Sequence, residues 1–464
     1  MKVFLALPPH SLEERYNKSL AKAAGTLPPL GILYLAAVLK QHGHEVQVCD
    51  GSMQDYATMI DRIRTFRPDF IGFSTMAFIW RQTKQMIQNI KRELPHVTIA
   101  LGGNHATIYK KRCLTECPEA DLIMFGECEQ TLTEVVHALE KKKSLAGIKG
   151  IIYRKGKQLV QNEDRPLITD LDSLPFPARD LLPIKDYTPA MEQYRRKPVT
   201  NVMTSRGCPF QCTFCTSRNT GMRLRSPANV VLELKELVDN YGIREVAFWD
   251  DTFTLNQARV RELCRLIKEA KLDIVWSAHS RVNTLTVETA QAMKEAGCWK
   301  IFFGVESLVQ KNLDTIKKGI TVQQAFDAIK ITNELGIESE CSFMFGIPGE
   351  TYEEALQTIS LIKKLNPTYA KFFQHTFFEG QERAELEKVG TLITEDLENV
   401  TGNTVTFVPH SMTREQLEGL VPTAYRQFYL RPKYVFNYVK RMRSVEDVKR
   451  AMNGFRAVIS MKSP

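Results

Sequence analysis

The chain has 464 residues, a length that corresponds to about three domains of ordinary size. Hydrophobic residues make up 43% of the sequence and charged residues 25%, so the chain can bury globular cores and is not a disordered tail. The formal net charge is +9, but residues 425–464 hold ten Lys or Arg against two acidic residues, which leaves the rest almost neutral. This distribution argues against a globally basic nucleic-acid-binding protein, and we expect no nucleic-acid partner.

No stretch approaches the roughly 18 consecutive apolar residues that a membrane span needs. The apolar N-terminus runs directly into Pro8 and Pro9, so it is too short for a signal peptide and is typical of a buried first strand. Ten cysteines without a secretion signal predict reduced thiols or metal ligands rather than disulfides. We therefore expect a cytoplasmic protein.

Short apolar runs alternate with helical patterns through residues 1–140. This alternation predicts right-handed βαβ crossovers and a Rossmann-like, doubly wound parallel sheet. The expected strands are Lys2–Leu7, Glu45–Cys49, Asp69–Ser74, Val97–Leu101 and Asp121–Phe125, with helices over Pro29–His42 and Gln82–Leu94.

Ligands of such sheets bind at the carboxyl ends of the strands. Small or polar residues recur at these ends, where a backbone would have to approach a large flat ligand closely. The candidates for this site are Pro9, Ser74, Thr75, Gly102, Gly103, His105, Gly126 and Glu127.

Residues 141–195 read as a linker, with a charged run, a hairpin-like alternation over Gly150–Val160 and then a proline-rich stretch. A second alternation covers 196–400, and its six strand–helix units suit a partial (β/α)6 barrel. The expected strands are Thr200–Met203, Glu245–Trp249, Asp273–Ala278, Lys300–Gly304, Glu340–Phe345 and Ala370–His375. Residues 401–464 read as a basic helical extension.

Three cysteines follow the first of these strands in the segment SRGCPFQCTFCTS. Cys208, Cys212 and Cys215 have the spacing C-x3-C-x2-C, which can hold three irons of a cubane cluster and leave the fourth iron open to another ligand. The alternatives are a zinc site or unpaired core cysteines. Structural zinc requires four protein ligands, and the other seven cysteines are not spaced as a second half-site.

This loop, with Phe214 before its last cysteine, resembles the radical S-adenosylmethionine (SAM) superfamily. Polar residues at later strand ends are also similar to that family. The resemblance implies a [4Fe-4S] cluster, SAM as cofactor, and reductive cleavage of SAM to a 5′-deoxyadenosyl radical. It also implies that Phe214, Asp250, Arg281, Glu306 and Gly346 bind SAM, with Glu306 at its amine or ribose and Arg281 at its carboxylate. A structural ion pair at the barrel rim is the alternative for Glu306 and Arg281.

The N-terminal domain lacks the fingerprints G-x-G-x-x-G and G-x-x-x-x-G-K-[ST], which makes NAD and ATP poor candidates. The order of its strand-end residues resembles the cobalamin-binding domain that precedes many radical SAM barrels. The motif D-x-H-x-x-G, whose histidine binds cobalt from below, is absent, and His10 lies in its place without the Asp and Gly. We interpret His105 as a loop contact to cobalamin or a solvated histidine rather than a cobalt ligand.

The resemblance to cobalamin-dependent radical SAM enzymes implies methylation of an unactivated carbon through methylcobalamin as the commonest outcome. The principal alternative is oxidation, cyclisation or ring rearrangement, as in the anaerobic magnesium-protoporphyrin monomethyl ester cyclase. Remote alternatives are a non-catalytic corrinoid sensor and methylthiolation of tRNA. The expected partners are a small-molecule or lipid substrate and a one-electron donor such as flavodoxin or ferredoxin.

The basic C-terminal segment carries apolar residues at helical spacing, namely Tyr434, Val435, Tyr438, Val439 and Met442. Such a helix would dock its apolar face on the barrel and keep an ordinary solvated face. The alternative is that its cations, which include Lys433 and Arg443, meet an acidic partner or a membrane surface.

Overall fold

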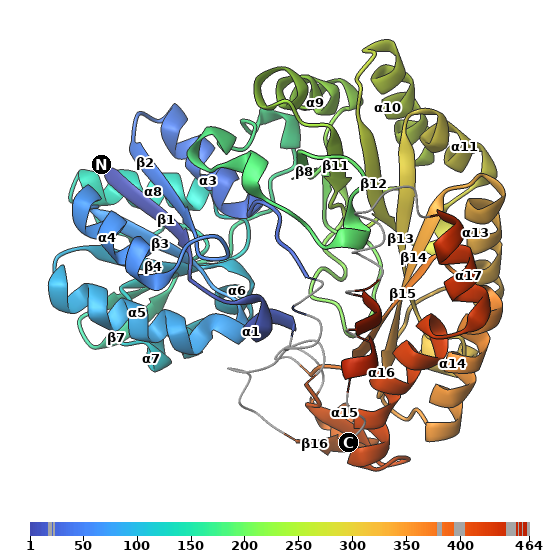
Figure 1. Cartoon of the computed structure of the whole chain (residues 1–464). Helices are drawn as coiled ribbons and strands as arrows, with labels where there is room; N and C mark the ends of the chain where they lie inside the picture. The colour runs from blue at the N-terminus through green and yellow to red at the C-terminus, as the bar shows by residue number, and fades with distance from the viewer. Residues whose placement is uncertain are drawn as a thin grey trace. The chain divides into compact units, whose positions relative to one another are not determined.

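The computed structural model describes residues 1–16, 21, 24–377, 383–393, 404–441, 452, 454–456 and 458–461. The chain divides into two compact units (Figure 1). The first is built from Met1–Arg15 and Thr26–Asp186, and the second mainly from Tyr187 onward. Within the described ranges, no helix combines the length and apolar composition that crossing a membrane requires.

The first unit contains a seven-stranded sheet in the order β2-β1-β3-β4-β5-β6-β7. Neighbouring strands from β2 to β5 run parallel, as the alternation predicts, and β6 and β7 add an antiparallel hairpin. In this order the chain moves from one side of β1 to the other between β2 and β3, which creates a switch point where ligands bind. The strands are β1 (Lys2–Leu7), β2 (Glu45–Asp50), β3 (Phe70–Ser74), β4 (Thr98–Gly102), β5 (Leu122–Met124), β6 (Ile151–Lys155) and β7 (Gln158–Gln161).

Helices cover both faces of this sheet. On one face α3 packs on β1 and β2 and contacts α8. On the other face α4, α5 and α7 contribute Met59, Ile87 and Leu114 to a core with Phe4 and Ile71, all nearly inaccessible to solvent. The helices are α1 (Leu12–Tyr16), α3 (Leu30–Gln41), α4 (Tyr56–Phe66), α5 (Trp80–Glu93), α6 (Gly103–Tyr109), α7 (Lys111–Glu116) and α8 (Glu129–Glu140). The unit is therefore doubly wound, as expected.

The segment interpreted as a linker differs from that interpretation in its first half. Residues 151–161 form the hairpin β6–β7, because β6 pairs with β5 and so extends the sheet. The division between the units falls after Asp186 rather than at 140 or 195. The proline-rich remainder forms only short 3-10 turns, namely Leu171–Ser173, Arg179–Leu181, Ile184–Asp186 and Met191–Gln193.

The second unit contains six parallel strands in chain order, and its edge strands β8 and β15 do not pair. This is the open, partial barrel that the six strand–helix repeats predict. Its strands are β8 (Val199–Val202), β11 (Glu245–Phe248), β12 (Val275–Ser280), β13 (Cys298–Glu306), β14 (Glu338–Phe345) and β15 (Tyr369–Gln374).

The helices follow one another along the outer side of this sheet (Figure 1). Side chains that accept a hydrogen bond from the first turn cap the long helices, which explains why each starts where it does. The caps are Ser226, Asn256, Thr286, Thr321 and Thr351. The helices are α9 (Pro227–Tyr241), α10 (Gln257–Glu269), α11 (Val287–Glu295), α12 (Gln310–Thr315), α13 (Val322–Glu334) and α14 (Tyr352–Leu365).

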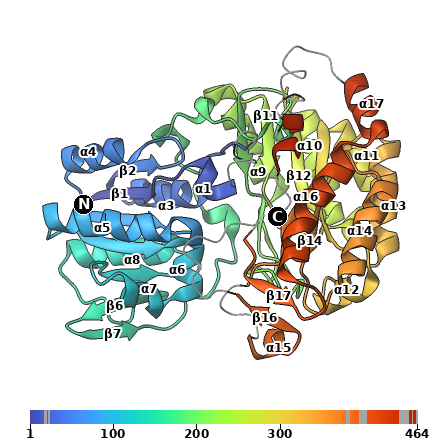
Figure 2. The ribbon, with the colours of Figure 1, turned by 60° about the horizontal axis from the view of Figure 1, so that its bottom comes forward.

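Beyond the barrel, the described residues form α15 (Arg383–Glu387), a hairpin of β16 (Gly390–Leu392) and β17 (Phe407–Pro409), and the helices α16 (Arg414–Tyr429) and α17 (Pro432–Arg441). Figure 2 shows α16 beside α14, and α16 also packs on β15. Phe372 of β15 meets the rings of Tyr425 and Phe428 of α16.

The predicted apolar face of the C-terminal helix is only partly buried. Tyr434 contacts the rings of Phe428 and Tyr429, whereas Val435 and Val439 are exposed. Met442 and Arg443 lie outside the described residues. The docked helix that the spacing predicts is present, and it leaves part of its apolar surface in solvent.

Candidate functional site

The three-cysteine loop begins where β8 ends. Ser205–Arg206 pairs antiparallel with Arg223–Leu224 and so closes the loop at its base. Thr220 bonds both the N–H and the C=O of Cys208, at 3.1 Å each. Gly207 adopts φ = 86°, and a Cβ there would lie 2.0 Å from the carbonyl oxygen of Gly221, so glycine is required before the first cysteine.

The loop brings its three thiols close enough to interact. Cys208 and Cys212 are buried, Cys215 is half-buried, and all three are free thiols. Burial raises the pKa of Cys215, and the neighbouring charges of Asp251, Cys212 and Cys208 raise it further against the hydrogen bond from Ser217.

The donor set fits a cubane cluster. In the described part of the chain no three His, Cys, Asp or Glu side chains converge on a single metal ion. A [4Fe-4S] cluster does not require such convergence, because each thiolate binds a different iron. Cys208, Cys212 and Cys215 would hold three irons and leave the fourth to SAM.

Arg281 lies against the cysteine loop. Its Nη1 donates to Sγ of Cys212 at 3.4 Å, and its guanidinium stacks 3.6 Å from the ring centre of Phe210. It also donates to the carbonyl oxygen of Lys318. The buried cation therefore lies directly against the sulfur of Cys212, and its predicted contact with the SAM carboxylate stays a prediction.

Glu306 ends β13 and forms the ion pair that the alternative interpretation expected, but with Lys318 rather than Arg281. Lys318 Nζ lies 2.9 Å from Oε1 of Glu306, and Ser342 Oγ donates to the same carboxylate at 3.4 Å. Glu306 has φ = 72°, a strained value for a residue with a side chain, which these contacts stabilise.

Lys318 contacts two of the predicted SAM residues, Glu306 and Phe214, and was not itself predicted from the sequence. Its Nζ also lies 5.6 Å from the ring centre of Phe214, which packs against Ile316 and Ile347. The only signal in the sequence is a short basic run before Gly319, a pattern too common to identify a site.

Asp250 bonds the backbone and side chains of the residues that lead into the cysteine loop. Its carboxylate accepts hydrogen bonds from the Thr204 N–H at 2.7 Å, from the Thr204 hydroxyl at 2.5 Å and from the Ser205 hydroxyl at 2.8 Å. Burial raises its pKa, and these bonds oppose the rise. Both oxygens are engaged with the residues that lead into the cysteine loop, so Asp250 positions that loop.

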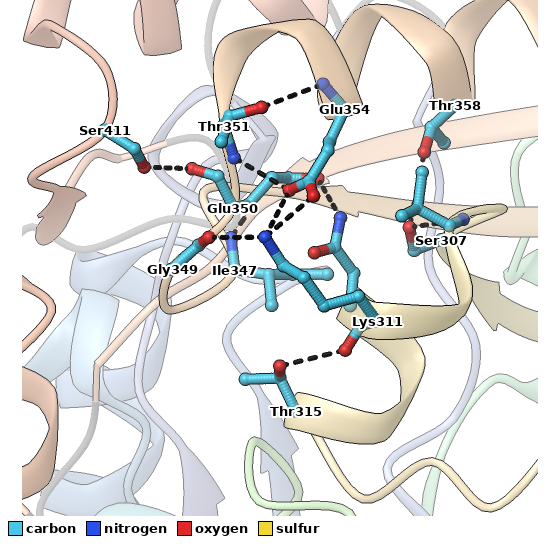
Figure 3. A network of polar contacts seen from close by, with 12 residues as sticks. Ser307, Lys311, Thr315, Ile347, Gly349, Glu350, Thr351, Glu354, Thr358 and Ser411 are labelled. Carbon is cyan, nitrogen blue, oxygen red and sulfur yellow. Dashed lines mark hydrogen bonds and ion pairs between the residues drawn. The ribbon is translucent and has the colours of Figure 1, made fainter.

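Gly346 begins the turn after β14, and Glu350 holds this turn from inside (Figure 3). Glu350 Oε2 accepts the N–H groups of Gly346 and Ile347 at 2.7 and 3.2 Å, and Asn312 Nδ2 lies 3.0 Å from Oε1. Burial raises the pKa of Glu350 to about 8 against these hydrogen bonds. The carboxyl is therefore largely protonated at neutral pH.

We expect Glu350 to make stability depend on pH. Its pKa is near 4.5 in the unfolded chain and about 8 in the folded one, so its contribution to stability is fully present below pH 4.5 and lost as the pH rises through 8. The free energy of unfolding should fall by roughly 4–5 kcal/mol across this range. In Glu350→Gln the fall should largely disappear in denaturant titrations at several pH values.

The control is Glu353→Gln, which changes an exposed carboxylate in the first turn of α14, three residues after Glu350, and should keep the native pH dependence. An equal fall in Glu350→Gln and the native protein would contradict the assignment.

In the first unit, the predicted ligand edge brings β3 and β4 together. Thr75 donates its N–H and hydroxyl to the carbonyl oxygen of Gly102 at 2.8 and 2.7 Å, and its own carbonyl accepts the His105 N–H at 3.2 Å. Gly103 has φ = 84°, and a Cβ there would lie 2.9 Å from Ser74 Oγ and from Thr75 backbone atoms. Ser74, Thr75, Gly102, Gly103 and His105 therefore lie together where β3 and β4 end.

His105 is buried rather than solvated, which corrects one of the two interpretations. Its ring lies 4.7 Å from Trp80 and 4.6 Å from Tyr109, centre to centre, and burial lowers its pKa to about 4. Nδ1 is buried without a hydrogen-bond partner in the described part of the chain. A neutral imidazole with a free nitrogen fits a contact to a polar ligand group.

The other predicted residues of this edge are less uniform. Glu127 accepts the Ile168 N–H at 2.7 Å and so orders the segment after β7. A Cβ added at Gly126 would meet no atom within 4 Å. Pro9 precedes His10, whose Nδ1 lies 3.0 Å from the Pro8 carbonyl oxygen. The small residues and the orphaned nitrogen of His105 fit a large cofactor such as cobalamin, and Glu127 has a structural partner.

Comparison with known proteins supports the interpretation of both units. A model of the Radical SAM superfamily matches residues 202–362, and a model of the B12 binding domain matches residues 17–136. An uncharacterized methyltransferase of Pyrococcus horikoshii is 37% identical over 463 residues, with 98% of each chain covered. The anaerobic magnesium-protoporphyrin IX monomethyl ester cyclase of Rubrivivax gelatinosus is 27% identical over 91% of this chain and 78% of the cyclase.

Among solved structures, the cobalamin-dependent SAM radical enzyme OxsB with aqua-cobalamin bound superposes with a TM-score of 0.77 at 17% identity. The match covers 99% of this chain and 72% of OxsB. At this identity the likeness shows the fold, a Rossmann-like unit followed by a partial barrel.

Proposed function

This chain belongs to the cobalamin-dependent radical SAM enzymes, whose cofactors are a [4Fe-4S] cluster, SAM and cobalamin, and we propose that it methylates an unactivated carbon of a small-molecule or lipid substrate. The observation that supports this proposal most is the 37% identity to a methyltransferase over almost the whole length of both chains. When bound, the cofactors supply a 5′-deoxyadenosyl radical and a transferable methyl group.

The residues of the second unit divide this work. Cys208, Cys212 and Cys215 hold the cluster, and Arg281 places a buried positive charge beside Cys212. Glu306, held by Lys318, offers carboxylate oxygens for the amine or ribose of SAM. Phe214 and the turn at Gly346 lie beside this pair.

The residues of the first unit hold the second cofactor. A Cβ at Gly126 would meet no atom within 4 Å, so the backbone there leaves room for the close approach of a flat macrocycle. Gly103 allows the adjoining backbone to pack tightly on Ser74 and Thr75 at the same edge. His105 contributes a free ring nitrogen to the same edge. An external one-electron donor of the flavodoxin or ferredoxin type would supply the electron.

The test is an anaerobic reaction of protein reconstituted with iron, sulfide and cobalamin. After addition of SAM and a strong reductant, 5′-deoxyadenosine and S-adenosylhomocysteine are quantified while the corrinoid spectrum is followed. We expect both nucleosides and a corrinoid spectrum that changes with SAM. Formation of 5′-deoxyadenosine alone would contradict methyl transfer and favour the cyclase type, to which the 27% identity also points.

A further inference from the structure

Aromatic side chains are buried on the outer face of the barrel sheet and accessible to solvent on its inner face. On the outer face, which the helices cover, Phe248, Trp276 and Phe303 are at most 1% exposed. On the inner face, Trp249 is 40% exposed, His279 is exposed and Phe302 is half-buried. Apolar rings that stay accessible inside a folded barrel indicate a surface that receives a ligand.

The three inner rings form one row across adjacent strands. Trp249 directly follows β11 beside β12, and His279 is paired in register with Phe302 of β13. The rings of Trp249 and His279 are nearly parallel, 23° apart, with centres separated by 6.5 Å. The centres of His279 and Phe302 are 5.0 Å apart. The row therefore offers ring faces and edges to a flat molecule.

The row also has a polar member that lacks a partner. Protein atoms surround His279 but leave its side chain exposed to solvent, and this partial desolvation lowers its pKa, so the imidazole is neutral at pH 7. Within the described residues, neither ring nitrogen of His279 forms a hydrogen bond to protein, so both are open to a ligand. One nitrogen can accept and the other can donate a hydrogen bond.

The charges next to the row are already neutralised. Glu340, paired in register with Phe302, lies 2.6 Å from Lys300 and 2.7 Å from Lys371. Lys371 also meets Glu192 at 3.5 Å. These two cations and two anions carry no net charge together, so the part of a ligand that contacts the row needs no charge of its own.

The row begins directly beneath the cysteine loop. Trp249 directly precedes Asp250, whose carboxylate accepts hydrogen bonds from the residues that lead into that loop. The N–H of Trp249 donates to the carbonyl oxygen of Val202 in β8 at 2.9 Å. His279 stands two residues before Arg281, the partner of Cys212. A molecule on the row therefore lies next to the place where the radical forms.

We propose that Trp249, His279 and Phe302 form the substrate platform of this enzyme, and that the substrate carries an uncharged, flat conjugated ring with a hydrogen-bonding group beside the carbon that is methylated. This proposal rests on the proposed function for the methylation and on the ring geometry for the substrate class. Trp249 supplies stacking area, and His279 selects the hydrogen-bonding group.

The test uses the anaerobic, fully reconstituted protein and three compounds of matched skeleton. These are 2-naphthol, its saturated counterpart decahydro-2-naphthol, and 2-methoxynaphthalene, which cannot donate a hydrogen bond. Calorimetric titration should show 2-naphthol binding about 10-fold or more tighter than the saturated compound. Trp249→Ala should remove this preference, and His279→Leu should remove the preference for 2-naphthol over 2-methoxynaphthalene.

Two controls keep the result specific. Tyr56→Ala removes an exposed aromatic residue of the first unit and should bind 2-naphthol as the native protein does. The affinity for SAM, titrated separately, should stay within about twofold in Trp249→Ala and His279→Leu.

Absent binding of 2-naphthol, or equal affinity for 2-naphthol and its saturated counterpart, would overturn the platform. So would a loss of SAM affinity in Trp249→Ala that equals the loss of 2-naphthol affinity, because the row would then hold SAM. S-adenosylhomocysteine release, measured without these compounds, reports on the methyltransferase assignment independently. If the protein binds 2-naphthol as expected but releases no S-adenosylhomocysteine, the platform is supported and the methyltransferase assignment is contradicted.

Discussion

Cys212→Ala should abolish both the cluster and the cleavage of SAM. The three cysteines share one loop, so a cluster deprived of one thiolate loses a third of its protein ligands and becomes labile. We expect the iron content of reconstituted protein to fall from about four atoms per chain to nearly none. The formation of 5′-deoxyadenosine under strong reduction should fall at least about 1,000-fold, because radical generation requires the cluster.

The matched control is Cys264→Ala, which removes a buried cysteine of α10 away from the loop. Burial raises the pKa of Cys264 to about 12, so this thiol stays protonated at neutral pH and we expect it to take no part in holding the cluster. Native iron content in Cys264→Ala, together with loss in Cys212→Ala, assigns the cluster to the loop. An iron-replete Cys212→Ala protein that still cleaves SAM would refute this assignment.

Glu340→Gln should destabilise the second unit by about 3–5 kcal/mol. Glu340 and Lys300 have side chains only 2% and 4% exposed, and Lys371 also pairs with Glu340. Removing the carboxylate leaves the buried ammonium group of Lys300 without its countercharge, a cost that water cannot relieve, whereas Lys371 keeps Glu192 as a partner. Denaturant-induced unfolding, followed by circular dichroism, measures the change directly.

A control variant and the pH dependence separate the effect of the buried charge of Glu340 from that of an exposed ion pair. Glu338→Gln on the same strand breaks a pair with Arg195, which is 44% exposed, so it should cost less than about 1 kcal/mol. Burial alone would raise the pKa of Glu340, but Lys300 and Lys371 override it and lower the pKa to about 2. The pair therefore stabilises the fold above pH 4.5, and this contribution disappears as the pH falls towards 2. A Glu340→Gln protein as stable as Glu338→Gln would contradict the prediction.

Patterns local in sequence determined much of this protein. Apolar runs bounded by glycine or proline placed β1 of the first unit at the predicted residues and the six barrel strands within a few residues of their observed bounds. The spacing of Cys208, Cys212 and Cys215 was sufficient to predict a cluster loop, because ligands on one tight loop are neighbours whatever the rest of the chain does. Prolines explained why residues 162–195 contain no long helix.

Only the tertiary structure decided which side chains meet across strands. Lys318 pairs with Glu306, Asp250 bonds Thr204 and Ser205, and the hairpin of residues 151–161 joins the first sheet. These contacts join residues that are distant or unremarkable in sequence, and their register depends on how whole elements pack. Burial is equally non-local, since His105 and His279 look alike in the sequence, but packing excludes water from His105 and lowers its pKa to about 4, whereas it leaves His279 exposed.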